Sequence, residues 1–141
     1  MYSKFQLEII TPEREFFSGE VEQVIIITVD GERGILKGHY PIVAALLPGS
    51  IRLLINNKWH EAANSEGFIM AMPDKVLIMV QTVEWPEELE EQLVRETIIK
   101  ALERIKQKKN IDIVKYKLGK ASLARSFARL KVINRSKGNI K

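Results

Sequence analysis

The sequence contains no cysteine, which excludes disulfide bonds and thiolate chemistry. It also lacks any apolar run near the ~18 residues needed to cross a bilayer, and its first residues do not resemble a signal peptide. Histidine is scarce, and His39 and His60 have no metal-ligand spacing to each other or to a pair of carboxylates. We therefore expect a soluble protein on the cytosolic side, with no metal site and no cofactor.

Motifs of catalysis are missing as well. The chain has no phosphate-binding loop of the Gly-x-x-x-x-Gly-Lys type and no nucleophile elbow. Gly31, Gly34 and Gly38 are wrongly spaced for a dinucleotide loop and are better explained as turn residues that need positive φ. We expect no catalytic residue, and the residues favour a protein that is not an enzyme.

The charge that is present is unevenly distributed. Over 141 residues the formal net charge is +4. Residues 1–85 hold 7 Lys and Arg against 11 Asp and Glu, whereas residues 86–141 hold 15 against 7. The hydrophobic share of 45% is enough for a packed core. A slightly acidic body with a basic tail predicts an acidic partner for the tail.

Residues 1–85 have the pattern of an antiparallel β-sandwich. Phe5, Leu7 and Ile9 alternate with polar residues, which is the period of a strand. Further strand-like runs cover residues 21–29, 42–47, 51–55, 59–63, 68–72 and 76–80. Turn signals lie at 30–31, 48–49, 56–57 and 73–74. Many short strands at close spacing are typical of a sandwich or barrel.

Pro86 marks a change to a helical period, so residues 86–141 predict a two-helix antiparallel hairpin and the whole chain an α+β protein of two domains. The break is expected near Asn110, with Asp112 as a cap, and residues 134–141 are expected to fray. The apolar positions expected on the first helix are Leu89, Leu93, Val94, Ile98, Ala101, Leu102 and Ile105. Those on the second are Ile113, Leu118, Ala121, Leu123, Ala124, Phe127, Ala128 and Leu130.

The basic tail leaves nucleic-acid binding open as an alternative function. Phosphates would attract the cations of the second helix, namely Lys115, Lys117, Lys120, Arg125, Arg129 and Lys131. Aromatic residues for base stacking are sparse there, with Tyr116 and Phe127 as the candidates. A solvated face of a helix hairpin explains the same charges more simply.

Three segments stand out, namely residues 11–14 (TPER), residues 17–22 (FSGEVE) and residues 30–41 (DGERGILKGHYP), the last with a Gly-Ile-Leu run followed by Gly-His-x-Pro. In this order they resemble the opening and the signature of the epsilon subunit of bacterial and chloroplast F-type ATP synthases. Residues 48–52 (PGSIR) and 121–132 (ASLARSFARLKV) resemble its next turn and its C-terminal helix. The resemblance runs from about residue 5 to residue 132, nearly the whole chain.

The resemblance implies a non-catalytic subunit of the central stalk. It implies that the sandwich binds the gamma subunit and the membrane c-ring and so couples ion translocation to ATP synthesis. It also implies that the hairpin either folds against the sandwich or extends along gamma, where it meets the catalytic beta and alpha subunits and blocks ATP hydrolysis. The expected location is peripheral, at the cytoplasmic face of a bacterial cell membrane, with contact to the membrane through the complex. The stromal face of the chloroplast thylakoid is the second choice.

The same resemblance identifies candidate residues for contacts with partner subunits and with ATP. Glu32 and His39 are the candidates for c-ring contact, and Arg125 and Arg129 are the candidates for contact with an acidic loop of the catalytic subunits. Some members bind ATP through an Ile/Leu-Asp-x-x-Arg-Ala motif, which here reads Leu89-Glu90-Glu91-Gln92-Leu93-Val94. A nucleotide site would use Leu89, Glu90, Arg125 and Arg129. Because Leu93 replaces the motif's arginine, we expect ATP binding to be weak or absent.

Overall fold

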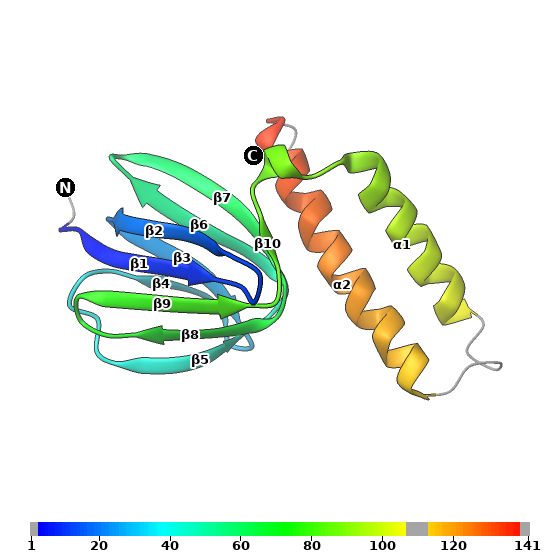
Figure 1. The fold of residues 1–141 in the computed structure, drawn as a ribbon, viewed down its shortest axis with the longest axis horizontal. Coiled ribbons are helices and arrows are strands. Elements are labelled where there is room, and N and C mark those ends of the chain that lie inside the picture. The colour runs from blue at the N-terminus through cyan, green and yellow to red at the C-terminus, as the bar shows by residue number, and fades with distance from the viewer. Residues whose placement is uncertain (1–2, 107–112, 139–141) are drawn as a thin grey trace. The chain divides into compact units, whose positions relative to one another are not determined.

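The computed structural model describes residues 3–106 and 113–138. The chain divides into two compact units, Met1–Trp85 and Pro86–Lys141, of which the first is built from strands and the second from helices (Figure 1). None of the described helices is long and apolar enough to cross a membrane.

The first unit holds ten strands joined into one continuous sheet that folds over on itself. Their bounds are β1 Phe5–Ile10, β2 Glu15–Val21, β3 Gln23–Thr28, β4 Gly31–Ile35, β5 Ile42–Leu46, β6 Gly49–Ile55, β7 Lys58–Asn64, β8 Gly67–Ala71, β9 Lys75–Val80 and β10 Val83–Glu84. The order is β10-β7-β6-β3-β5-β8-β9-β1-β2, with β4 also paired to β3. The two halves of the sheet are joined where Thr28 of β3 meets Leu46 of β5, and they face each other as the layers of a sandwich.

The core of the sandwich follows from strand alternation. Phe5, Leu7 and Ile9 of β1 are buried, and the residues between them are half-buried. The same two-residue period buries one side of β3 and of β9. Because successive side chains of a strand point to opposite faces, this pattern places one row of each strand between the layers. The predicted sandwich is confirmed, with one difference: β1 pairs with β9 in parallel.

The run of residues 21–29, predicted as one strand, is two strands. Val21 ends β2, Glu22 forms a corner, and β3 begins at Gln23. At the corner the backbone N–H of Glu22 donates to the carbonyl of Leu54, and the Glu22 carboxylate accepts from the N–H of Asn57. These contacts with the distant β6–β7 turn are invisible to a local apolar pattern, which explains the wrong prediction. Strands β2, β4 and β10 were also not predicted.

The second unit contains a short 3-10 helix, Pro86–Glu88, and two longer helices, α1 Glu91–Lys106 and α2 Ile113–Ser136. Figure 1 shows α1 and α2 running side by side as a hairpin. Their shared apolar core consists of Val94, Ile98 and Ile133, with Leu89, Leu123 and Leu130 packed against it. The predicted hairpin is thus confirmed, while Asn110, Asp112 and the connection around them lie outside the described residues.

Some residues of the predicted apolar faces point to solvent. Leu93 is 55% exposed and Phe127 is 50% exposed, and Leu102 and Leu118 are exposed as well. Leu93 lies one residue before the buried Val94, about 100° around the helix, and Phe127 lies about 120° from the buried Ile133. The contact between two helices is narrower than the full set of apolar positions, so the predicted faces were too wide.

Helix α2 continues to Ser136, beyond the point at which fraying was predicted, and residues 139–141 lie outside the described residues. The N–H of Lys137 donates to the carbonyl of Ile133, and the N–H of Gly138 donates to that of Arg135. Gly138 has φ +74°, a left-handed conformation that glycine adopts without strain. Residues 134–136 are therefore helical with a glycine cap, which corrects the expectation that they fray.

Candidate functional site

Of the two c-ring candidates, Glu32 is the second residue of β4 and His39 lies beyond the end of that strand. Glu32 stands next to the β3–β4 turn, and its carboxylate accepts a 2.6 Å hydrogen bond from the guanidinium of Arg52. His39 lies beyond the far end of β4, where its Nδ1 is 2.8 Å from the carbonyl of Tyr40 and its ring stacks on the Tyr40 ring. The structure therefore does not bring these two side chains together, although both lie on exposed segments that a partner could reach.

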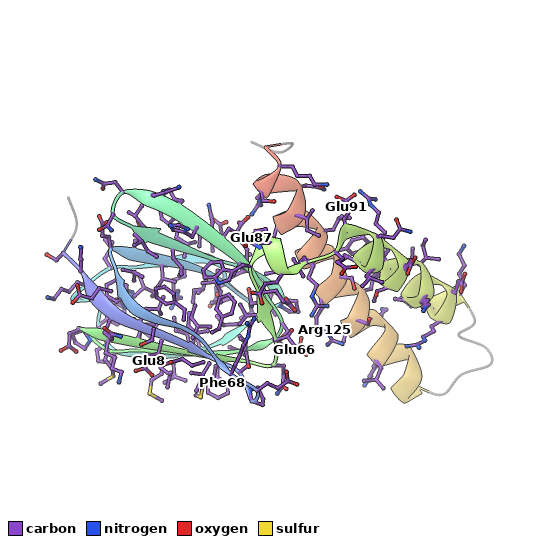
Figure 2. The ribbon with its side chains drawn as sticks, turned by 45° about the horizontal axis from the view of Figure 1, so that its top comes forward. Glu8, Glu66, Phe68, Glu87, Glu91 and Arg125 are labelled. Atoms are coloured by element: carbon purple, nitrogen blue, oxygen red, sulfur yellow. The ribbon has the colours of Figure 1, made fainter. Side chains whose placement is uncertain are left out.

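The β8 strand exposes apolar side chains on the face opposite the core. Ile69 and Ala71 are buried, whereas the alternate residues Phe68 and Met70 are 45% and 40% exposed. Figure 2 shows Phe68 at the surface of the sandwich. Across the sheet, Val43 of β5, 70% exposed, is directly opposite Met70. An exposed strand face made of Val, Phe and Met is unusual for a solvated surface and indicates a binding site.

The neighbouring strand β9 extends this apolar surface. Its outward residues are half-buried and lie opposite the exposed residues of β8, with Met79 paired to Phe68 and Leu77 to Met70. We define the outer face of β5, β8 and β9 by Val43, Ala45, Phe68, Met70, Leu77 and Met79. Sequence reasoning missed this outer face. Its signal is that β8 and β9 are apolar at both alternating sets of positions, which a strand with one solvated face does not require.

A polar border limits the outer face on its β1 side. There the carboxylate of Glu8 lies 3.6 Å from the ammonium of Lys75, and the amide of Gln6 donates to the hydroxyl of Ser18. An apolar centre flanked by exposed polar pairs is the usual composition of a protein–protein interface.

A pocket of about 290 Å³ opens where the outer face meets the β1–β2 and β7–β8 turns. It is lined by Ile10, Thr11, Pro12, Glu66, Gly67, Phe68, Met79, Val80 and Gln81. Phe68 and Met79 belong to both the pocket and the outer face, so the two form one surface. The Thr11 hydroxyl accepts from the backbone N–H groups of Glu13 and Arg14, which leaves a mostly apolar lining suited to an apolar side chain.

The pocket floor requires a glycine. A Cβ on Gly67 would lie 2.1 Å from the carbonyl oxygen of Met79 and 2.7 Å from the Cα of Val80. The absence of a side chain at Gly67 therefore lets β8 approach β9 closely beside the pocket. Among the described residues, no group of three or more His, Asp or Glu is placed to hold a metal ion.

Comparison with known proteins places this fold in a family. A family profile described as "ATP synthase, Delta/Epsilon chain, beta-sandwich domain" matches residues 4–86. The ATP synthase epsilon chain of Ruminiclostridium cellulolyticum is 44% identical over 131 residues, covering 93% of this chain and 96% of the relative. That of Caldicellulosiruptor bescii is 37% identical over 138 residues, covering 98% and 99%. The chain belongs to the ATP synthase epsilon chain family.

Solved structures agree on the fold of this epsilon-family chain. A chain in the Euglena gracilis mitochondrial ATP synthase with OSCP, F1 and c-ring superposes with a TM-score of 0.78 at 20% identity, covering 91% of this chain and 80% of that chain. A chain in the Tetrahymena thermophila mitochondrial ATP synthase central stalk and c-ring gives 0.56 at 16% identity, covering 99% and 98%.

The candidate nucleotide and inhibitory residues lie at different levels of the hairpin. Leu89 and Glu90 precede α1, at the end where α1 meets Lys137. Arg129 and Arg125 are 8 and 12 residues before Lys137, which at the helix rise corresponds to about 12 and 18 Å along α2. Both arginines are half-buried and have interaction partners. Leu93, at the position of the missing motif arginine, is exposed on α1.

Proposed function

We propose that this epsilon-family protein is a non-catalytic rotor subunit of the ATP synthase central stalk that docks on gamma through the outer face. The observation that carries the proposal is the exposed Val43–Phe68–Met70 surface on a chain that matches epsilon relatives over nearly its whole length. Burying one such side chain is worth about 1.5–3 kcal/mol. A few of them supply most of the affinity of an ordinary protein interface.

A binding experiment with purified gamma tests this docking. We expect Phe68→Lys and Met70→Lys each to weaken binding by about ten- to hundredfold, because each removes buried apolar area and adds an unpaired cation. Trp59→Lys is the matched control, since Trp59 is a similarly exposed aromatic residue on β7, outside the outer face. If gamma binds to another surface, the Phe68 and Met70 variants will bind gamma as tightly as the control does.

Glu32 and His39 are proposed as two separate contacts with the c-ring. Glu32 lies in β4 next to the β3–β4 turn, whereas His39 lies beyond the other end of β4, so each can be tested by itself. Glu32→Gln also breaks the ion pair with Arg52. Comparing it with the double variant Glu32→Gln, Arg52→Gln separates the loss of the Glu32 carboxylate from the effect of leaving the Arg52 cation without that partner. Coupled proton pumping in reconstituted vesicles is the measurement, and His39→Ala is compared in the same assay.

The hairpin is proposed as an inhibitory arm that reaches the alpha and beta subunits through Arg125 and Arg129. These residues are one helical turn apart and therefore share a face of α2. We expect Arg125→Ala with Arg129→Ala to weaken inhibition of ATP hydrolysis and truncation before residue 110 to abolish it. Equal hydrolysis by complexes with and without residues 110–141 would end this part of the proposal.

Tight ATP binding is not part of the proposed function. Losing a charge-assisted phosphate contact costs about 1.5–3 kcal/mol, or about ten- to hundredfold in affinity. Calorimetry on the isolated subunit is expected to show weak or no binding, and Leu93→Arg tests whether the missing cation explains it. The nucleic-acid alternative predicts a salt-dependent mobility shift with DNA or RNA, which we expect to be absent at physiological salt.

A further inference from the structure

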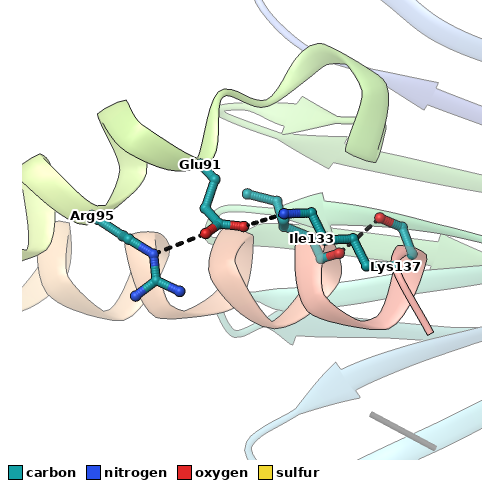
Figure 3. Close-up of polar contacts among 5 residues, drawn as sticks. Glu91, Arg95, Ile133 and Lys137 are labelled. Carbon is teal, nitrogen blue, oxygen red and sulfur yellow. Dashed lines mark hydrogen bonds and ion pairs between the residues drawn. The ribbon is translucent and has the colours of Figure 1, made fainter. Parts of the chain in front are cut away.

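The first residue of α1 shares its carboxylate between two cations. Glu91 Oε2 accepts a 3.0 Å hydrogen bond from Nε of Arg95, and Glu91 Oε1 accepts a 2.6 Å hydrogen bond from Nζ of Lys137 (Figure 3). Arg95 lies one turn further along α1, whereas Lys137 follows the end of α2. The Arg95 contact therefore stays within one helix, and the Lys137 contact joins the two helices.

The backbone at the end of α2 fixes where Lys137 lies. Its N–H donates to the carbonyl of Ile133, which also accepts the Ser136 hydroxyl at 2.8 Å, and Gly138 closes the helix. The left-handed conformation of Gly138 ends the helix directly after Lys137. Lys137 is therefore held at the level of Glu91, at the end of the hairpin opposite the 107–112 connection.

The described contact between the helices is apolar along much of its length. Val94, Ile98 and Ile133 form a buried cluster with three half-buried leucines, and Ala101 and Ala128 are buried as well. The Glu91–Lys137 pair closes the end that is free to separate, since the other end is joined by the chain itself.

Opening the pair leaves neither charge in an unfavourable place. Glu91 stays at the N-terminus of α1 and Lys137 at the C-terminus of α2, where each charge interacts favourably with the dipole of its own helix. The Arg95–Glu91 pair lies within α1, so separating the two helices does not by itself break it. The contact is therefore reversible, because breaking it buries no unpaired charge.

We propose that the Glu91–Lys137 contact is a latch that holds α1 and α2 together and sets the balance between the closed hairpin and separated helices. Arg95 is a positioning residue that holds the Glu91 carboxylate toward Lys137. The regulatory meaning of the latch rests on the proposed inhibitory function of the hairpin, whereas the closure of the hairpin does not.

The strength of the latch follows from its exposure. The side chains of Lys137 and Glu91 are 53% and 31% exposed, so solvent and salt screen their attraction. Partly exposed pairs of this kind shift an equilibrium by about two- to fivefold. A latch of this strength biases the hairpin toward closure and still opens when a partner binds the separated helices.

Distance measurement in the isolated full chain tests the latch directly. Because the sequence has no cysteine, Lys100→Cys in α1 and Ala124→Cys in α2 give two unique labelling sites for spin-label distance measurement. We expect Glu91→Gln and Lys137→Gln each to raise the ratio of open to closed hairpins about two- to fivefold, and high salt to act in the same direction. The double variant is expected to equal either single variant, because each change removes the same contact.

Two controls separate the latch from general effects on the helix. Glu103→Gln removes a carboxylate from the same helix without touching Lys137, and Lys137→Arg keeps the cation; both are expected to preserve the distance. Circular dichroism establishes that each variant retains its helices. The latch is refuted if the Glu91 and Lys137 variants match Glu103→Gln, or if their effects add fully.

ATP hydrolysis by the assembled complex, measured with the same variants, distinguishes this proposal from the proposed function. A changed distance with unchanged hydrolysis keeps the latch and removes the inhibitory role of the hairpin. An unchanged distance removes the latch, whatever the hydrolysis rate is.

Discussion

Gly67→Ala tests the close approach of β8 and β9 on which the outer face and its pocket depend. The added Cβ would lie 2.1 Å from the Met79 carbonyl oxygen and 2.7 Å from both Cα and Cγ1 of Val80. Two of these three atoms are backbone, so relief requires the paired strands to separate rather than a side chain to rotate. Adding a methyl group to a packed site typically costs 1–3 kcal/mol, and the backbone clash places this variant at about 3 kcal/mol or more.

Thermal and urea unfolding followed by circular dichroism measure this cost. For a domain of this size, 1 kcal/mol corresponds to about 4–8 °C in the melting temperature, so we expect Tm to fall by more than about 10 °C. Gly34→Ala is the matched control, because its Cβ would meet the amide nitrogen at the far end of the Gln23 side chain at 2.9 Å, which can move away. We expect the control to change stability by less than about 1 kcal/mol.

Comparing Gly67→Ala with Gly34→Ala also separates the effect of a steric clash from the effect of backbone strain. Neither Gly67 nor Gly34 has positive φ, so conformational strain does not distinguish them. If the Tm of Gly67→Ala lies within about 2 °C of that of the parent protein, β8 and β9 do not approach as closely as described. The claim that the pocket requires a glycine at position 67 would then be wrong too.

Three further perturbations test other contacts. Arg14→Ala removes a hydrogen bond to the Val83 carbonyl and a cation–π contact with Phe16, whose ring lies 4.6 Å from that of Trp85. We expect the free energy of unfolding to fall by about 1–2 kcal/mol. The fluorescence of Trp85 is expected to shift as well, and it is measured in a Trp59→Phe background. Gly138→Ala places a side chain at φ +74°, and we expect it to destabilise the end of α2 by about 1 kcal/mol, seen as faster amide exchange there, whereas a tolerated alanine would contradict the glycine cap. Hydrogen bonds from Lys137 and Arg95 lower the pKa of Glu91 below its ordinary value of 4.5, so closure is expected to persist at neutral pH and to weaken as pH falls through that lowered pKa; labelled hairpins followed from pH 7 to 3 measure this, and Glu91→Gln should remove the pH dependence.

The sequence by itself determined the division into a sandwich and a hairpin. Residues alternating every second position, such as Phe5, Leu7 and Ile9, have one side that must be buried in a sheet, and the three- and four-residue spacing of Val94, Ile98 and Ala101 does the same for a helix. These periods depend on local backbone geometry, which is why they could be read from the chain. The segment 30–41 and its neighbours also carried enough family-specific residues to indicate the epsilon family before any fold was known.

Tertiary structure decided which apolar residues are available to partners. Phe68 and Ile69 look alike in the sequence, and the pairing of β8 between β5 and β9 places one outward and the other in the core. Likewise Phe127 and Leu130 share a helical run, and the narrow contact between α1 and α2 leaves Phe127 exposed. The choice depends on the packing partner, and a local pattern carries no information about that partner.

Long-range pairs were equally hidden. Glu91 and Lys137 are separated by 46 positions and meet because the hairpin is antiparallel and α2 continues to Ser136 before its glycine cap. Glu32 and His39 lie close in sequence, yet β4 carries the chain between them in an extended conformation and sets them apart. Strand and helix periods are set by neighbours within a few residues, whereas these placements depend on how whole elements dock, which the folded structure alone decides.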